Sequence, residues 1–233
     1  MAELRDELQA VAQQSSVSER ADEYGRVLMR VLRDPPAHAL AGALDTFVEL
    51  SVLDRSNTTG AGLIAGRAAL QSFNALVRAA HDTPGHALVD AELYLGVVQS
   101  ALAKASEHAM NLEHEIAQLR LLVADQLEDM HRWRDAAGTL QEVLVPSARL
   151  AQPDDALLLH VRLLRLFLRL DDLASADTII KRASSLAHQA SSARDDSALR
   201  SDHGASTVDT LAAFRGCQAD IFDRQHRYMD ASD

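Results

Sequence analysis

A repeated register in the second half of the chain constrains the fold more than any other feature. Three times, a large apolar residue stands three positions before an alanine; the pairs are Trp133 and Ala136, Leu173 and Ala176, and Tyr228 and Ala231. The anchors are 40 residues apart (173 minus 133) and then 55 (228 minus 173). A small or apolar residue also lies nine positions before each anchor, at Ala124, Leu164 and Ala219. The unit is therefore a pair of helices, and pairs repeated at about 40 residues are typical of α-solenoids.

The composition agrees with a helical protein. The 233 residues include only 10 Gly and 5 Pro, and only 4% are aromatic, whereas 47% are hydrophobic. Residues that favour helices are abundant and strand-forming segments are few. We therefore predict an all-α fold, a right-handed α-solenoid of TPR-like helix pairs with about eleven helices and no sheet.

Apolar residues spaced three and four apart locate these helices. Ser16 and Glu19 have the spacing of a capping box and predict a helix that ends before Pro35. Either Asp154 or Asp155 is expected to be an N-cap. The other helices are expected near 3–14, 37–53, 63–80, 87–106, 110–129, 133–145, 157–170, 173–189 and 207–223, with a last one that contains Tyr228.

The polar stretch 191–206 lies between the second and third repeats and accounts for the 15 extra residues, so we expect a loop insertion there. The repeat signal is weak before residue 130 and clear after it. We therefore expect an N-terminal helical-repeat arm over 1–129 and TPR-like repeats over 130–233. The last helix pair is interrupted at Asp233, which would expose an apolar face for a further repeat or a partner.

Sequence patterns of catalytic and metal sites are incomplete. The stretch 114–118 has Gln118 where a zinc-binding helix would carry its second histidine. A bundle di-metal site needs two Glu-x-x-His motifs, and Glu128 with His131 supplies one. The single cysteine, Cys217, is best explained as a small buried residue. We predict no catalytic, cofactor-binding or metal-binding residues, no cofactor, and no enzymatic activity.

The charge and hydropathy patterns limit the partners. A net charge of −11 disfavours nucleic acid and anionic membranes, and no apolar run approaches the ~20 residues of a membrane span. Arg162, Arg165 and Arg169 share one helix face, for which pairing with nearby Asp and Glu is favoured over an acidic partner or nucleic acid. Trp133 is expected to be a core anchor of its helix pair.

Several motifs resemble one family of helical-repeat subunits. They begin with the Trp-Arg-Asp-Ala-Ala sequence at 133–137 and continue through 165–168, the acidic turn Asp171-Asp172 and the Arg-Ala-Ser-Ser-Leu sequence at 182–186. In the N-terminal half, the segments 24–28, 44–49 and 66–73 follow in the same order with similar gaps. These stretches resemble the COP9 signalosome subunit 4 family, although Lys181 replaces that family's asparagine.

The resemblance implies a non-catalytic scaffold in the complex that removes a ubiquitin-like modifier from cullins. It implies other signalosome subunits and cullin-RING ligases as partners in a hetero-oligomer, and a location in cytoplasm and nucleus. In the family, residues corresponding to 130–233 lead toward a PCI module whose winged helix is absent here. The alternative is the homologous non-ATPase subunit of the proteasome regulatory lid, or another helical-repeat adaptor.

Overall fold

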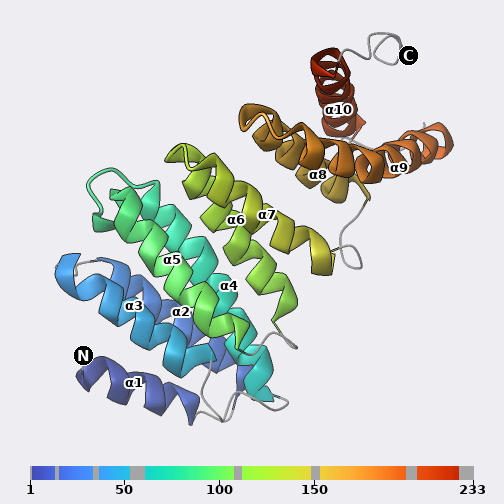
Figure 1. Ribbon diagram of the computed structural model, residues 1–233. Helices are drawn as coiled ribbons and strands as arrows, with labels where there is room; N and C mark the ends of the chain where they lie inside the picture. The colour runs from blue at the N-terminus through green and yellow to red at the C-terminus, as the bar shows by residue number, and fades with distance from the viewer. Residues whose placement is uncertain are drawn as a thin grey trace. The chain divides into compact units, whose positions relative to one another are not determined.

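The computed structural model describes residues 2–13, 16–33, 37–52, 61–107, 112–147, 153–197 and 204–225. These residues form ten α-helices and one short 3-10 helix, with no strand among them (Figure 1). The helices are α1 (Ala2–Ala12), α2 (Val17–Arg33), α3 (Ala37–Val52), α4 (Ala61–His81), η2 (Ala87–Val89), α5 (Ala91–Ser106), α6 (Glu113–Asp129), α7 (Trp133–Ser147), α8 (Pro153–Arg169), α9 (Leu173–Ser197) and α10 (Gly204–Arg224). The prediction of an all-α fold is confirmed.

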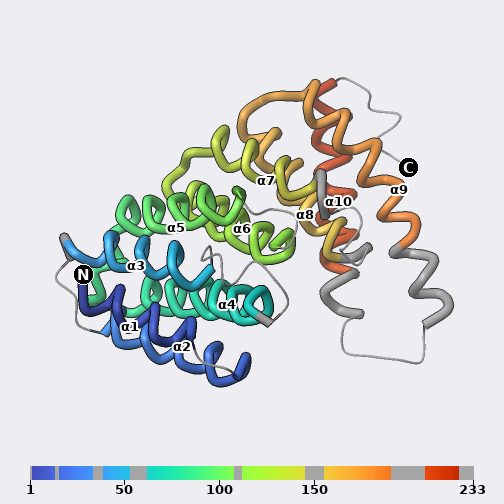
Figure 2. Tube along the Cα trace, turned by 90° about the horizontal axis from the view of Figure 1, so that it is seen from below, coloured from blue at the N-terminus to red at the C-terminus, as the bar shows by residue number. Residues whose placement is uncertain are grey.

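The chain divides into two compact units, Met1–Gln126 and Leu127–Asp233. In the first unit alternate helices lie side by side in two rows, with α1, α3 and α5 in one row and α2 and α4 in the other. Hydrogen bonds join α6 to α4 and extend the second row. Figure 2 traces the path of these helices along the chain. This arrangement is that of stacked helix pairs.

In the second unit, α8 packs against α7, α9 and α10, and α10 also packs against α9. Residues of the repeat register are buried within this unit. Ala136, Leu164 and Ala176 are each fully buried. A side chain no larger than a methyl group at Ala136 and Ala176 allows neighbouring helices to approach closely, which explains why the register selects alanine there.

An aromatic cluster lies at the centre of the first unit. The rings of Tyr24 and Phe47 meet edge to face at 6.2 Å, and those of Phe47 and Phe73 stack at 6.5 Å. These three side chains come from α2, α3 and α4, and each is at most 1% exposed. Such ring pairs add to the stabilisation from apolar burial, so this cluster joins both rows of helices.

The turns that follow α6 and α8 have the same hydrogen-bond pattern. Arg132 donates its backbone N–H to the carbonyl of Leu127 (2.8 Å), and 40 residues later (172 minus 132) Asp172 donates to Phe167 (3.0 Å). A second bond in each turn joins residue 131 to 128 and residue 171 to 168. Each of these two turns is therefore a Schellman motif. The 40-residue repeat is thus present in the backbone as well as in the sequence.

Side chains cap several helix starts. Ser16 Oγ accepts the N–H of Glu19 at 3.4 Å, which confirms this side of the predicted capping box. Asp90 accepts the N–H groups of Glu92 and Leu93, so α5 begins at Ala91 rather than at the predicted residue 87. The four residues before it form η2 and its connection, because the Asp90 cap stops the helix from extending backwards.

Two predicted boundaries in the second unit are wrong. The helix α8 begins at Pro153, so Asp154 and Asp155 lie in its first turn and neither is the N-cap. Proline has no backbone N–H to lose at a first helical position, which makes it a good start residue. The expected loop at 191–206 is helical over 191–197 and 204–206, since Ala, Ser and Arg are compatible with a helix. The predicted eleventh helix lies outside the described residues.

The role predicted for Trp133 is also wrong. Its side chain is only partly buried, whereas the buried core of α7 consists of Ala136, Ala137, Leu140 and Val143. Cys217 matches its predicted role: it is 7% exposed, and burial raises the pKa of its thiol although Arg165 opposes the shift. In the part of the chain described here, no helix combines the length and the apolar character that a bilayer crossing requires.

Candidate functional site

Many of the charged and polar side chains of the described residues bond to other parts of the chain. No group of three or more His, Cys, Asp or Glu residues is placed to hold a metal ion in these ranges. His81, His86 and His160 form hydrogen bonds with the carbonyls of Leu88, Leu32 and Ala156, respectively. The remaining candidate features among the described residues include two grooves on the surface.

A polar seam runs between α4 and α6. Gln71 donates to Glu115 at 2.9 Å, Asn74 donates to Gln118 at 3.4 Å, and the Arg67 guanidinium lies 3.5 Å from Glu115. Glu115 is 1% exposed, so its carboxylate is buried within this seam. Buried charges need such partners because desolvation is costly. In the sequence, Glu115 is part of the incomplete zinc motif at 114–118, and its structural role depends on residues of α4 that lie about 44 positions earlier.

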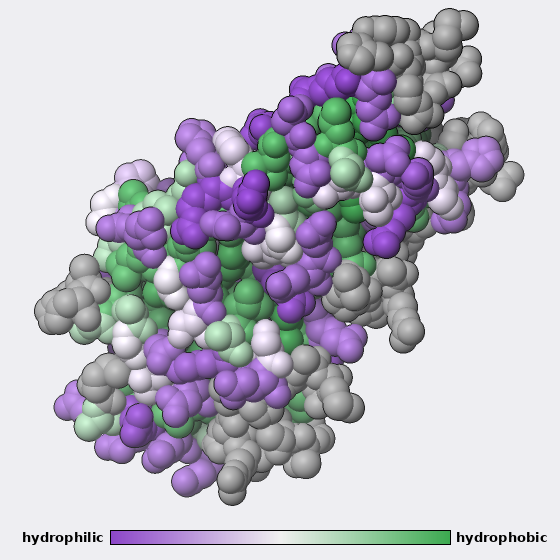
Figure 3. All heavy atoms as spheres, viewed as in Figure 1, coloured by the Kyte–Doolittle hydropathy of each residue, from purple (hydrophilic) through white to green (hydrophobic). Residues whose placement is uncertain are grey.

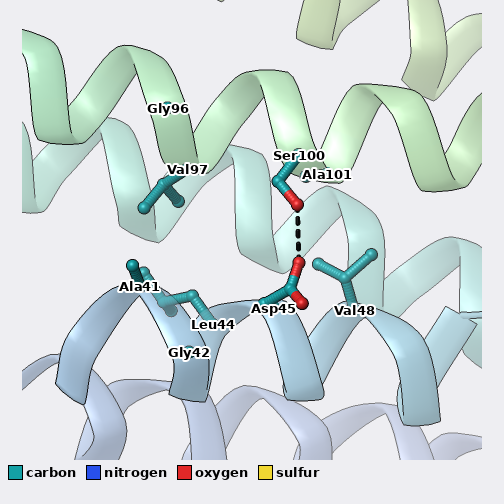
Figure 4. A pocket seen from close by; sticks show the side chains of 9 residues that line it. All are labelled: Ala41, Gly42, Leu44, Asp45, Val48, Gly96, Val97, Ser100 and Ala101. Carbon is teal, nitrogen blue, oxygen red and sulfur yellow. Dashed lines mark hydrogen bonds between the residues drawn. The ribbon is translucent and has the colours of Figure 1, made fainter.

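A small groove lies between α3 and α5 (Figure 4). Its volume is about 270 Å³, and buried Leu44, Val48 and Val97 are among the residues that line it. Gly42 and Gly96 line the groove with backbone alone. A Cβ added at Gly96 would have no atom of a neighbouring helix within 4 Å. The groove can hold an apolar side chain from another molecule.

One end of this groove is polar. Asp45 accepts a hydrogen bond from Ser100 at 2.5 Å (Figure 4). Asp45 also forms an ion pair with Lys104 at 2.7 Å. Partial burial raises the pKa of the Asp45 carboxyl, but the bonds from Lys104 and Ser100 and the charge of Lys104 outweigh it, so the pKa lies below its usual value. The carboxylate therefore stays ionised and ties α3 to α5.

A second groove lies between α7 and α9 in the other unit. Its volume is about 300 Å³, and it is lined by Gln141, Leu144, Ser175, Thr178, Ile179 and Arg182. At the start of α9, Asp172 accepts bonds from the Ser175 N–H (3.0 Å) and hydroxyl (2.7 Å). These bonds lower the pKa of the Asp172 carboxyl. Ser175 is thus fixed by the helix cap on one side and lines the groove on the other.

The arginine stripe of α8 does not act as one face. Arg162 pairs with Glu128 at 2.6 Å, as predicted, whereas Arg165 interacts with Cys217. Arg169 does not follow the predicted pairing with an acid, since its guanidinium carbon lies 4.4 Å from the centre of the Trp133 ring. The three arginines are therefore used in three different ways.

The face of the molecule in Figure 3 is hydrophilic over much of its described area, with hydrophobic residues between the polar ones. Among the described residues, the large exposed apolar side chains come from five different helices; they are Met29, Ile64, Val89, Leu158 and Val208. Isolated apolar side chains of this kind are normal for a protein surface.

Comparison with known proteins identifies the family. The family described as PSMD12/CSN4, N-terminal, matches residues 3–233. The chain belongs to this family. Within it, the chain is 27% identical over 210 residues to COP9 signalosome complex subunit 4 of Emericella nidulans, which covers 90% of this chain and 44% of that protein. It is 25% identical over 144 residues to the subunit of the same name from Dictyostelium discoideum, covering 61% of this chain and 32% of that protein.

The chain spans less than half the length of both of these curated relatives. The resemblance inferred from the motifs at 133–137 and 182–186 is confirmed, since both relatives carry the name of subunit 4. The family description also names PSMD12, so the proteasome-lid alternative fits the same family. Two rows of helices with shallow grooves are suited to contacts with other proteins.

Proposed function

We propose that this protein is a non-catalytic scaffold subunit of the COP9 signalosome that supports cullin deneddylation through protein–protein contacts. The observation that carries the proposal is the match of residues 3–233 to the PSMD12/CSN4 N-terminal family, together with two relatives named as signalosome subunit 4. The polar groups of Glu115, Asp45 and Asp172 support it, because each is engaged in joining or capping helices.

In this proposal the partners are other signalosome subunits and cullin-RING ligases, the assembly is a hetero-oligomer, and the protein works in cytoplasm and nucleus. Residues 1–129 serve as a helical-repeat arm, and 130–233 are TPR-like repeats that lead toward a PCI module. The protein contributes no catalytic group to the isopeptidase reaction. In this proposal, the scaffold regulates cullin-RING ubiquitin ligases by holding its neighbouring subunits in position.

Affinity purification tests the proposal. The tagged chain, and the full product of its gene, are expressed in cells of the source organism, and the bound proteins are identified by mass spectrometry. Signalosome subunits and cullins are expected. In cells that lack the protein, cullins that carry the ubiquitin-like modifier should accumulate, and expression of the wild-type gene should reverse this. Unchanged cullin modification would contradict the proposal.

The second candidate is the homologous non-ATPase subunit of the proteasome regulatory lid, because the family description names PSMD12 beside CSN4. The same purification separates the two. Recovery of proteasome particles without signalosome subunits would favour the lid, and cullin modification would then be independent of this protein. Recovery of neither complex would favour a different helical-repeat adaptor.

A further inference from the structure

A cluster of three side chains at the surface lies where α6 ends, α7 begins and α8 ends. The Trp133 ring is 5.0 Å from the His131 ring and 4.4 Å from the guanidinium carbon of Arg169. Trp133 is partly buried, and His131 and Arg169 are exposed. All three belong to the second unit. Trp and Arg are the residues that most often dominate binding energy at protein interfaces.

Arg169 has no carboxylate partner among the described residues, and its guanidinium contacts the Trp133 ring. The acidic side chains of the two adjacent turns are engaged elsewhere: Glu128 with Arg162, Asp135 with Arg132, Asp171 with Arg224 and Asp172 with Ser175. Asp129 is the exception, because it is exposed and none of the described residues pairs with it. The Arg169 guanidinium is thus a positive group with unused donors in a chain whose net charge is −11.

The stacking prepares this guanidinium for a ligand. A guanidinium is planar and presents five N–H donors in a fork that matches a carboxylate. Contact with the indole ring restricts the rotamers of Arg169 while leaving its N–H groups exposed to solvent. Less conformational entropy is then lost when a carboxylate binds. The exposed part of Trp133 offers an apolar surface beside that charge.

We propose that the cluster of His131, Trp133 and Arg169 binds an acidic peptide segment of a partner protein. Arg169 takes a Glu or Asp carboxylate through two parallel N–H bonds, and the aliphatic part of the segment lies on Trp133. Nucleic acid is the poorer fit, because binding to its backbone requires a surplus of basic residues. The inference goes beyond the scaffold function and applies to whichever assembly contains the chain.

Trp133 gives a direct readout, since it is the only tryptophan of the chain. The probe is a blocked peptide of alternating Glu and Gly residues, titrated into the purified full chain at low salt while tryptophan fluorescence is recorded. The matched peptide has Gln in place of each Glu. We expect a saturable change in fluorescence with the Glu peptide and at least tenfold weaker binding of the Gln peptide.

Three variants separate this site from general charge effects, with affinity measured by calorimetry and folding checked by circular dichroism. Arg169→Gln should weaken binding of the Glu peptide about tenfold, and Arg169→Lys should weaken it less because charge is kept without the fork. Asp129→Asn should strengthen it by removing a nearby negative charge. The matched control is Arg215→Gln, an exposed arginine on α10 in the same unit, which should leave the affinity unchanged.

Several outcomes would overturn the proposal. They are equal affinity of folded Arg169→Gln and wild type, an equal effect of Arg215→Gln, or equal binding of the two peptides. A single-stranded oligonucleotide is tested as an alternative ligand. If it binds more tightly than the Glu peptide and loses affinity in Arg169→Gln, the cluster is a nucleic-acid site and the acidic-peptide assignment is wrong.

Discussion

His131 and Asp171 occupy the same position in two successive turns, 40 residues apart (171 minus 131), and both have a left-handed backbone, with φ of 60° and 56°. Glycine is the usual residue at this position of a Schellman motif. Asp, Asn and His are the non-glycine residues that tolerate the conformation best. The repeat therefore preserves a backbone geometry while the side chain at the turn varies.

Substitution of Asp171 measures the backbone strain at this turn. Asp171→Gly should raise the free energy of unfolding by about 0.5–1 kcal/mol relative to wild type, because glycine adopts positive φ without a clash. The free energy of unfolding of Asp171→Ala should be about 1–2 kcal/mol lower than that of Asp171→Gly, because the alanine Cβ retains the steric clash at positive φ. Urea denaturation measures both. Both variants lose the exposed ion pair with Arg224, so equal stability of the two would exclude strain at this turn.

Enlarging a buried small residue of the repeat should disrupt helix packing. Ala176 on α9 is fully buried, so Ala176→Leu should lower the free energy of unfolding by about 1–3 kcal/mol. The matched control is Ala174→Leu, two residues earlier at an exposed position of the same helix, which should change stability by less than about 0.5 kcal/mol. Thermal denaturation gives the comparison. A similar loss in both variants would argue against close packing at Ala176.

The seam between α4 and α6 should contribute to stability through Glu115. Glu115→Ala removes a buried acceptor and leaves Gln71 without its bond, which should cost about 2–4 kcal/mol. Glu113→Ala, at an exposed position two residues earlier, is the control. A double-mutant cycle with Gln71→Ala should give a coupling of about 1 kcal/mol. Additive effects of the two changes would mean that the bond contributes nothing to stability.

His160 should make the stability depend on pH between 7 and 5. Burial lowers the pKa of this histidine, the bond to the Ala156 carbonyl opposes the shift, and the charge of Arg182 adds to it. Below the ordinary pKa of about 6.5, the unfolded chain takes up a proton that the folded chain resists. The free energy of unfolding should therefore fall as the pH decreases through that range.

His160→Gln should reduce the slope of this dependence. The measurement is the free energy of unfolding in urea at a series of pH values from 7 to 5, for wild type, His160→Gln and the exposed-site control His188→Gln. His188→Gln should show the same pH dependence of the unfolding free energy as wild type, because His160 is unchanged in it. If His160→Gln has the same slope as wild type, protonation of another group causes the dependence.

Much of the fold was predictable because its causes are local. Apolar spacing located the helices, and the Ser16 cap acts within three residues of its own position. The 40-residue register predicted helix pairs, and the equivalent turns at His131 and Asp171 confirm the repeat in the backbone. Family membership also followed from the sequence, since the motifs at 133–137 and 182–186 lie within the match to the PSMD12/CSN4 N-terminal family.

The features that could contact a partner were decided by tertiary structure. Whether Trp133 is buried depends on which neighbours cover it, and the stacking of Arg169 brings together residues 36 positions apart (169 minus 133). The burial of Glu115 depends on α4, and the groove at Gly96 exists because α3 lies beside α5. Helix formation follows from bonds and side chains within a few residues, whereas exposure and electrostatic pairing depend on distant segments that only the folded chain brings into contact.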